Sequence, residues 1–130
     1  MLYQAKVTTM YHTINPFQDQ ARFMEACGQT TMGANAGQFG LYKKLIAEEV
    51  TELNNALSQV EELDALVDIL VVTIGAIHSM GADGEGAWNE VMRSNLAKID
   101  PITGKVHKRE DGKVLKPEGW QPPNLKSYLR

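Results

Sequence analysis

One long apolar stretch, residues 63–77, constrains the fold of this chain more than any other feature. Its residues would be apolar on almost every side of a helix, a pattern typical of a helix in the centre of a bundle. Asp64 and Asp68 interrupt the stretch, so it lacks the unbroken apolar character of a membrane span. We therefore predict a buried core helix from about Glu61 to Met80, and no membrane partner.

The two aspartates inside this helix need an explanation, because a buried charge is costly unless it is paired or bound to a metal. At about 100° per residue, Asp64, Asp68 and Glu61 lie within roughly 60° of one another on the helix surface. These residues therefore form an acidic face on an otherwise apolar helix. Such a face predicts a positively charged partner.

The preceding helix, predicted from about Gln38 to Gln59, carries a second acidic face made of Glu48, Glu49 and Glu52. These glutamates fall on an arc roughly 100° wide. A very short break near Val60 makes the two helices antiparallel neighbours, so that their acidic faces meet. Mg²⁺ prefers oxygen ligands and removes the repulsion between converging carboxylates. We predict a site for Mg²⁺, with Mn²⁺ as a substitute, of a kind that suits phosphoryl chemistry.

The rest of the chain adds two helices and an irregular tail. Asn15 before Pro16 and Asp83 before Gly84 are typical helix starts. The predicted fold class is all-α: one domain over residues 1–130, with a bundle of four main helices at about 15–98 and a C-terminal tail at 99–130. In the tail, Val106 and Val114 flank Asp111-Gly112, which predicts a small hairpin.

Composition narrows the function classes. The 130 residues suffice for one compact domain, and the formal net charge of −3 gives no reason to expect a nucleic-acid surface. The lone Cys27 cannot form an internal disulfide, so we expect a reducing compartment, the cytoplasm. The apolar helix has more apolar surface than four helices of one chain can cover, which predicts a homodimer or homotetramer.

Several motifs together resemble a known superfamily. The sequence resembles the all-alpha NTP pyrophosphohydrolases, the MazG-like and phosphoribosyl-ATP pyrophosphohydrolase-like superfamily, and is most similar to its small single-domain branch. The resemblance is carried by the EExxE element Glu48-Glu49-Val50-Thr51-Glu52, the ExxD element Glu61-Glu62-Leu63-Asp64, the segment Arg93-Ser94-Asn95-Leu96-Ala97-Lys98 and the segment Asp111-Gly112-Lys113-Val114-Leu115-Lys116.

The resemblance implies Mg²⁺-dependent hydrolysis of a nucleoside triphosphate, here expected to be a deoxynucleoside triphosphate, between the α and β phosphates. It implies that Glu48 and Glu49 are catalytic, and Glu48 is our choice for orienting the attacking water. It implies that Asn95 and Lys98 contact the substrate's phosphates or sugar. The implied metal ligands are Glu48, Glu49, Glu52, Asp64 and Asp68.

Two registers of the second acidic helix remain open. Read literally, the ExxD element makes Glu61 and Asp64 the metal ligands. In many members of the superfamily, however, the ligand aspartate directly precedes a Leu-Leu or Ile-Leu pair, which makes it Asp68 here, with Asp64 one turn earlier. We favour Asp68, because it lies deepest in the apolar stretch and has no other evident compensation for its charge.

Two other functions are consistent with the same residues. One is phosphoribosyl-ATP pyrophosphohydrolase activity, which shares the metal-binding scaffold. The other is a non-catalytic interaction module in which the acids bind cations only to stabilise the fold. Release of pyrophosphate from a nucleotide distinguishes an enzyme from such a module.

Overall fold

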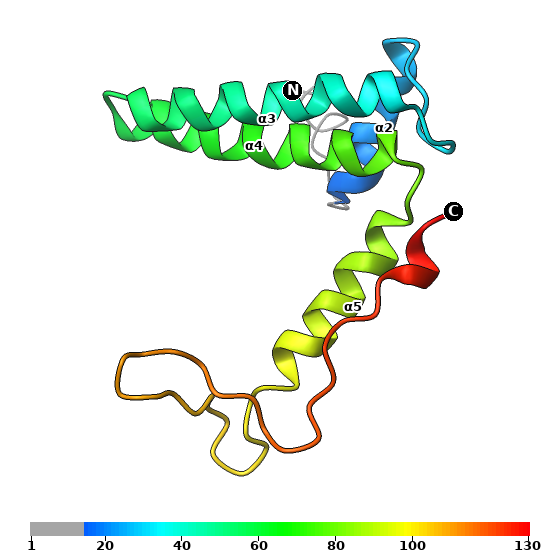
Figure 1. The fold of residues 1–130 in the computed structure, drawn as a ribbon. Coiled ribbons are helices and arrows are strands. Elements are labelled where there is room, and N and C mark those ends of the chain that lie inside the picture. The colour runs from blue at the N-terminus through cyan, green and yellow to red at the C-terminus, as the bar shows by residue number, and fades with distance from the viewer. Residues whose placement is uncertain (1–14) are drawn as a thin grey trace, which may run out of the picture. The chain divides into compact units, whose positions relative to one another are not determined.

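Helices make up most of the protein. The computed structural model describes residues 15–130. Its elements are α2 (Pro16–Ala26), α3 (Ala36–Asn55), α4 (Gln59–Ser79), α5 (Gly84–Leu96) and a short 3₁₀ helix, η1 (Lys126–Tyr128) (Figure 1). The part of the chain that is described contains four α-helices and no strand, so the prediction of an all-α fold is confirmed.

Each α-helix begins after a polar residue whose side chain accepts a hydrogen bond from the first turn, which satisfies one backbone donor left free at a helix start. These N-caps are Asn15, Asn35, Ser58 and Asp83. The starts after Asn15 and Asp83 are as predicted. The break between the two acidic helices lies at residues 56–58 and not near Val60, because Ser58 caps α4.

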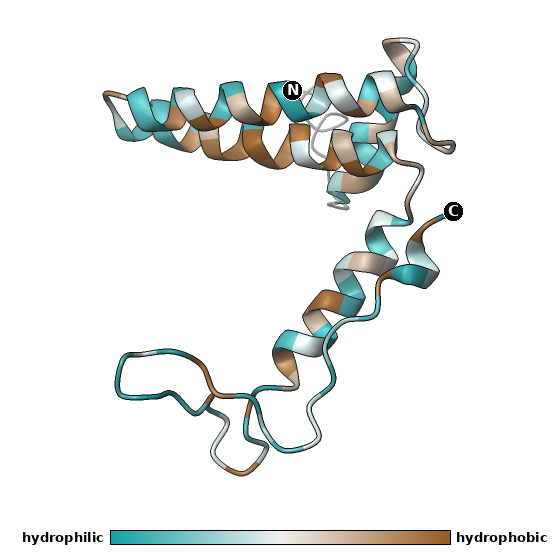
Figure 2. Cartoon of the chain, viewed as in Figure 1, coloured by the Kyte–Doolittle hydropathy of each residue, from teal (hydrophilic) through white to brown (hydrophobic). Residues whose placement is uncertain are grey.

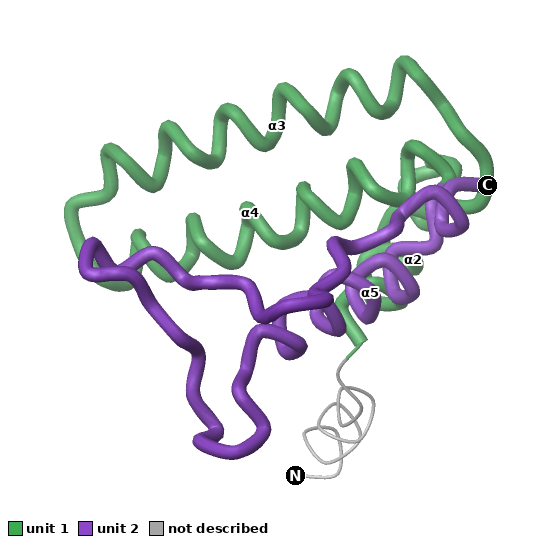
Figure 3. The backbone as a smooth tube through the Cα atoms, turned by 60° about the horizontal axis from the view of Figure 1, so that its bottom comes forward, with its two compact units in different colours: residues 1–81 green, residues 82–130 purple. Residues whose placement is uncertain are grey.

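The chain divides into two compact units, residues 1–81 and residues 82–130 (Figure 3). In the first unit, α3 and α4 are antiparallel and lie side by side (Figures 1 and 3). The short link between them explains this arrangement, because it leaves no room for a crossover. A single domain over residues 1–130 stays a prediction.

The core of the first unit lies where α2 meets α3 and α4, and it consists of Met24, Tyr42, Val72 and Ala76. A buried glutamine, Gln38, attaches the preceding loop to this core. Its side-chain Nε2 donates to the Thr30 carbonyl and to the Ser79 hydroxyl, each at 2.8 Å. Hydrogen bonding of this kind removes most of the cost of burying an amide. The segment before α3 is therefore held against the end of α4.

Helix α4 is apolar along most of its length (Figure 2). It buries Ala65 and Val72, yet Leu63 is 64% exposed and Leu70 is 61% exposed. The prediction that α4 is buried on nearly all sides is wrong for this chain, because α2 and α3 cover only part of its surface. Among the described residues, no single helix is long and apolar enough to cross a membrane. The bent pair of α4 and α5 would be long and apolar enough only if the two helices were counted as one span.

In the second unit, the C-terminal tail is attached to α5 by hydrogen bonds. The Arg93 guanidinium donates to the carbonyls of Gln121 and Pro122, both at 3.3 Å. The Glu90 carboxylate accepts from Arg93 and from the backbone N–H of Asn124, at 2.8 and 2.7 Å. These bonds hold the tail to one side of α5. The antiparallel bridge from Lys108 to Val114 confirms pairing around the predicted turn, whereas Val106 pairs with Ile99 and not with Val114.

Candidate active site

Four carboxyl groups meet between α3 and α4, and the pKa values of two of them, Glu49 and Asp68, are raised. Burial raises the pKa of Glu49, and a hydrogen bond with the Glu52 carboxyl raises it further. The negative charges of Glu52, Asp68 and Asp64 act in the same direction. A carboxyl surrounded by like charges holds its proton more tightly, because ionisation adds to the repulsion. The two acidic faces therefore meet as the sequence predicts.

Asp68 behaves in the same way on the opposite helix. Its pKa is raised first by burial, and then by the charges of Asp64 and Glu52. The residue is half-buried, whereas Asp64, one turn earlier, is exposed. Asp68 thus lies deeper in the helical pair than Asp64, and the assignment of Asp68 as a metal ligand stays a prediction.

One buried oxygen of this cluster has no hydrogen-bond partner within the described part of the chain. Glu49 is half-buried as a residue, but its Oε2 atom is excluded from solvent and has no hydrogen-bond partner among the described residues. An unsatisfied buried acceptor is rare and unfavourable. A cation would satisfy this oxygen and would lower the repulsion on Asp68 at the same time.

The carboxyl groups are not arranged as a finished metal site. Within residues 15–130, no group of three His, Cys, Asp or Glu side chains has the geometry to hold a metal ion. The chemistry of the donors nevertheless fits Mg²⁺, which takes oxygen ligands and keeps several waters, so it needs only one or two carboxylates. The buried Oε2 of Glu49, which has no hydrogen-bond partner among the described residues, is also an oxygen that Mg²⁺ would satisfy.

A cavity of about 330 Å³ opens at the linked end of the helical pair. Glu52 and Asp64 connect it to the acidic cluster, because both line the cavity and both act on Glu49. Its lining is polar at several positions, which suits a hydrophilic ligand. The remaining lining residues are Thr51, Asn55, Ala56, Glu61 and Ala65. Thr51 and Asn55 were not predicted as site residues, although both lie on the helical face that carries Glu52.

Glu61 has a structural role. Its Oε2 accepts a hydrogen bond from the Leu57 backbone N–H at 2.7 Å, while its own N–H donates to the Ser58 hydroxyl at 3.2 Å. This arrangement is a form of capping box, in which a Ser and a Glu three residues apart stabilise a helix start. The spacing Ser-x-x-Glu is visible in the sequence and could have identified this role. Glu61 therefore has an explanation that requires no metal.

The other predicted site residues lie outside the group formed by Glu49, Glu52, Asp64 and Asp68. Glu48 is exposed on α3, and its charge is not among those that raise the pKa of Glu49 or Asp68. Asn95 and Lys98 belong to the second unit, where the Lys98 ammonium donates to Asn95 Oδ1 at 3.2 Å. The structure thus brings together Glu49 with Glu52, Asp64 and Asp68 in one unit, and Asn95 with Lys98 in the other.

Fold and site together define the chain as an all-α protein with a carboxylate site between two antiparallel helices. Residues 20–95 match the phosphoribosyl-ATP pyrophosphohydrolase family. The match covers more than half of the chain, so the protein belongs to this family, which is part of the MazG-like all-alpha NTP pyrophosphohydrolase superfamily. The predicted superfamily is confirmed. No curated protein matches the chain.

The family assignment supports a pyrophosphohydrolase that acts on a nucleotide. The matched residues include all the acids discussed above and Asn95, and they end before Lys98 and the tail. The family is generally dependent on a divalent metal ion. This agrees with the oxygen-rich and mutually repelling donor set between α3 and α4.

Proposed function

We propose that the protein hydrolyses a nucleoside triphosphate to the monophosphate and pyrophosphate, in a reaction that depends on Mg²⁺. The observation that carries the proposal is the pair of raised pKa values at Glu49 and Asp68, on facing helices of a chain that belongs to a pyrophosphohydrolase family. Perturbed carboxyl groups that converge from two elements are typical of functional sites.

The four carboxylates between the helices, Glu49, Glu52, Asp64 and Asp68, would hold the metal, with Glu48 as a further ligand at the exposed edge of α3. Bound there, Mg²⁺ or Mn²⁺ would neutralise phosphate oxygens and acidify a bound water. Ionised carboxylates are required for this, so metal binding opposes the effects that raise the pKa values of Glu49 and Asp68.

The protein side chains orient the reacting groups. Glu48 is exposed, so its carboxylate is free to accept a hydrogen bond from the attacking water and to take its proton. Asn95 supplies an amide and Lys98 an ammonium group, the donors that phosphate oxygens and sugar hydroxyls require. The cavity beside Glu52 and Asp64 offers space for a hydrophilic part of the substrate.

Phosphoribosyl-ATP is a second candidate substrate, which the name of the matching family favours. Both reactions break the bond between the α and β phosphates and release pyrophosphate, so the same metal site serves either. We place nucleoside triphosphates first because the sequence, including its tail segment at residues 111–116, resembles the small single-domain MazG-like branch of the superfamily. A non-catalytic module remains the alternative if neither substrate is hydrolysed.

The decisive experiment is a substrate panel. Purified protein is incubated with the four ribonucleoside and four deoxyribonucleoside triphosphates and with phosphoribosyl-ATP, in Mg²⁺, in Mn²⁺ and in EDTA. Pyrophosphate and orthophosphate are measured separately. We expect pyrophosphate from at least one triphosphate, with none in EDTA. Turnover of phosphoribosyl-ATP alone would select the second candidate, and absence of pyrophosphate throughout would select the non-catalytic module.

We also propose that the chain forms a homodimer or homotetramer. Helix α4 exposes Leu63, Leu66, Val67 and Leu70, all at 48% or more. An apolar face of this length is unfavourable in water, and a second copy of the same helix is a suitable cover for it.

A further inference from the structure

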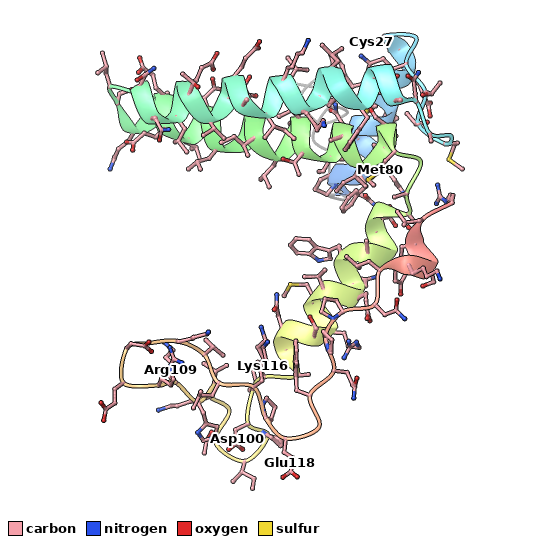
Figure 4. All side chains as sticks on the ribbon, viewed as in Figure 1. Cys27, Met80, Asp100, Arg109, Lys116 and Glu118 are labelled. Carbon is pink, nitrogen blue, oxygen red and sulfur yellow. The ribbon has the colours of Figure 1, made fainter. Side chains whose placement is uncertain are left out.

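Two lysine side chains approach the same aromatic ring in the second unit. The Lys98 ammonium lies 5.2 Å from the centre of the Trp120 ring, and the Lys116 ammonium lies 4.8 Å from it. The face of an indole carries negative charge density, so each contact is a favourable cation–π interaction. Figure 4 labels Lys116 beside the C-terminal end of α5. Lys98 follows shortly after this end of the helix in the sequence.

The ring is held in a defined position. Its Nε1–H donates to the carbonyl of Ser94, a buried residue of α5, at 2.7 Å. The backbone N–H of Trp120 donates to the Pro117 carbonyl at 3.1 Å, and Gly119 between them has a φ of 76°. Those features describe a type II turn, which requires a positive φ at its third position. The turn places Lys116 over the ring of its near neighbour Trp120.

The two positive charges are not balanced by carboxylates. Neither ammonium group forms a salt bridge within residues 15–130. Lys98 uses one N–H donor on the Asn95 amide oxygen, and Lys116 makes no hydrogen bond to the described residues. Since an ammonium group has three donors, most of the donors of this pair remain available. An oxyanion bound to either ammonium group would balance its charge and use its remaining donors.

We propose that Lys98, Lys116 and Trp120 form a phosphate-binding site, with polyphosphate as the class of ligand. That this ligand is the polyphosphate chain of the substrate rests on the function proposed above. That the site binds an oxyanion does not depend on that function. The site gives the C-terminal tail a role, because Lys116 and Trp120 lie outside the residues matched to the family.

Tryptophan fluorescence tests the site directly. The protein has two tryptophans, and Trp88 is 58% exposed, so Trp88→Phe leaves Trp120 as the only indole emitter. In this background, sodium tripolyphosphate is titrated in EDTA, with sodium chloride at matched ionic strength as a blank. We expect a saturable change in Trp120 emission. Lys116→Gln should weaken tripolyphosphate binding about three- to five-fold, as removal of one exposed charge pair typically does.

A matched control is Lys113→Gln, which removes the same charge from the tail at an exposed position without a ring contact. It should leave binding within about two-fold, the change expected for an exposed charge without a direct partner. An unchanged emission, or equal losses in Lys113→Gln and Lys116→Gln, would overturn the site and indicate only a diffuse positive surface.

Two further titrations distinguish pyrophosphate from a nucleotide as the source of the bound phosphate. Together with the hydrolysis assay, they also test the phosphate-binding site separately from the proposed function. Pyrophosphate and an α,β-methylene triphosphate analogue are compared, and tighter binding of the analogue identifies the nucleotide. If tripolyphosphate binds but no nucleotide is hydrolysed, the site stands and the proposed function fails. If hydrolysis is normal while Lys116→Gln alters neither binding nor KM, the function stands and this inference fails.

Discussion

The Tyr42 ring on α3 fills the space that a side chain at position 75 on α4 would occupy. A Cβ atom added to Gly75 would overlap the ring, whose hydroxyl group donates to Gln29 Oε1 at 2.6 Å. Gly75 lies inside α4, one turn before its end, where glycine is unfavourable, so its presence is explained by this close approach. The contact sets the distance between the helices that carry the acidic residues.

Gly75→Ala should therefore destabilise the protein by about 1–3 kcal/mol, the usual cost of inserting a methyl group into a filled core. Chemical denaturation followed by circular dichroism measures the change. Gly40→Ala on α3 is the control, because a Cβ there meets no atom within 4 Å. That change should be neutral or stabilising by up to about 1 kcal/mol. Equal effects at both positions would show that Tyr42 does not determine the helix spacing.

Glu49→Gln should abolish turnover and raise the stability of the metal-free protein. The raised pKa of Glu49 means that the folded state holds its proton more tightly than the unfolded chain does. Below a pH of about 4, both states are protonated and the substitution gains nothing. As pH rises above that value, the unfolded chain ionises first, so folding of the wild type is progressively penalised. The penalty is fully present above the raised pKa.

The measurement is the difference in Tm between Glu49→Gln and wild type in EDTA, from pH 4 to pH 8. This difference should grow with pH, and saturating Mg²⁺ should remove or reverse it. Glu48→Gln, an exposed neighbour on the same helix, serves as the control for stability. A lower Tm for Glu49→Gln across the whole range would instead assign Glu49 a stabilising partner.

Asp68→Asn and Glu61→Gln together decide the register of the second acidic helix. We expect Asp68→Asn to be inactive, because Asp68 is half-buried beside Asp64 and Glu52 and belongs to the proposed metal site. Glu61→Gln should keep most of its activity and lose some stability, since its carboxylate caps the start of α4. Turnover as a function of Mg²⁺ concentration is measured for both. The opposite ranking would favour the literal ExxD register.

Sedimentation velocity at micromolar concentration should give the mass of a dimer or tetramer. Leu70→Asp, at a position that is 61% exposed in the chain, should shift the distribution toward monomer. Ile102→Asp in the tail, at a position that is 92% exposed, should leave the mass unchanged. A monomer for the wild type would show that the apolar face of α4 is not covered by a second copy.

Much of the fold and of the acidic site follows from simple patterns. Helices capped by Asn15 and Asp83 begin where the sequence predicts, and antiparallel packing was enough to bring Glu49 and Asp68 to one side of the pair. The start of α4 was missed because the apolar period, which begins after Ser58, does not mark it, although the Ser-x-x-Glu spacing does. Glu61 was difficult to assign for another reason, since capping and metal binding use the same carboxylate.

The tail illustrates what local patterns cannot supply. Periodicity and turn residues predict a hairpin near Asp111, and the bridge from Lys108 to Val114 confirms it. The contact between Lys98 and Trp120 depends instead on how the tail returns along α5, through hydrogen bonds to backbone carbonyls. Backbone carbonyls are present at every residue, so no sequence pattern identifies which of them Arg93 selects.

The short link at residues 56–58 also has a kinetic consequence. Helices joined by so few residues make contacts that are local in sequence, and such contacts form early because little loop entropy is lost. The repulsion between Glu49 and Asp68 is therefore present as soon as α3 and α4 pair. A divalent cation between these helices would lower the free energy of the folding transition state as well as that of the native protein, and so would accelerate folding.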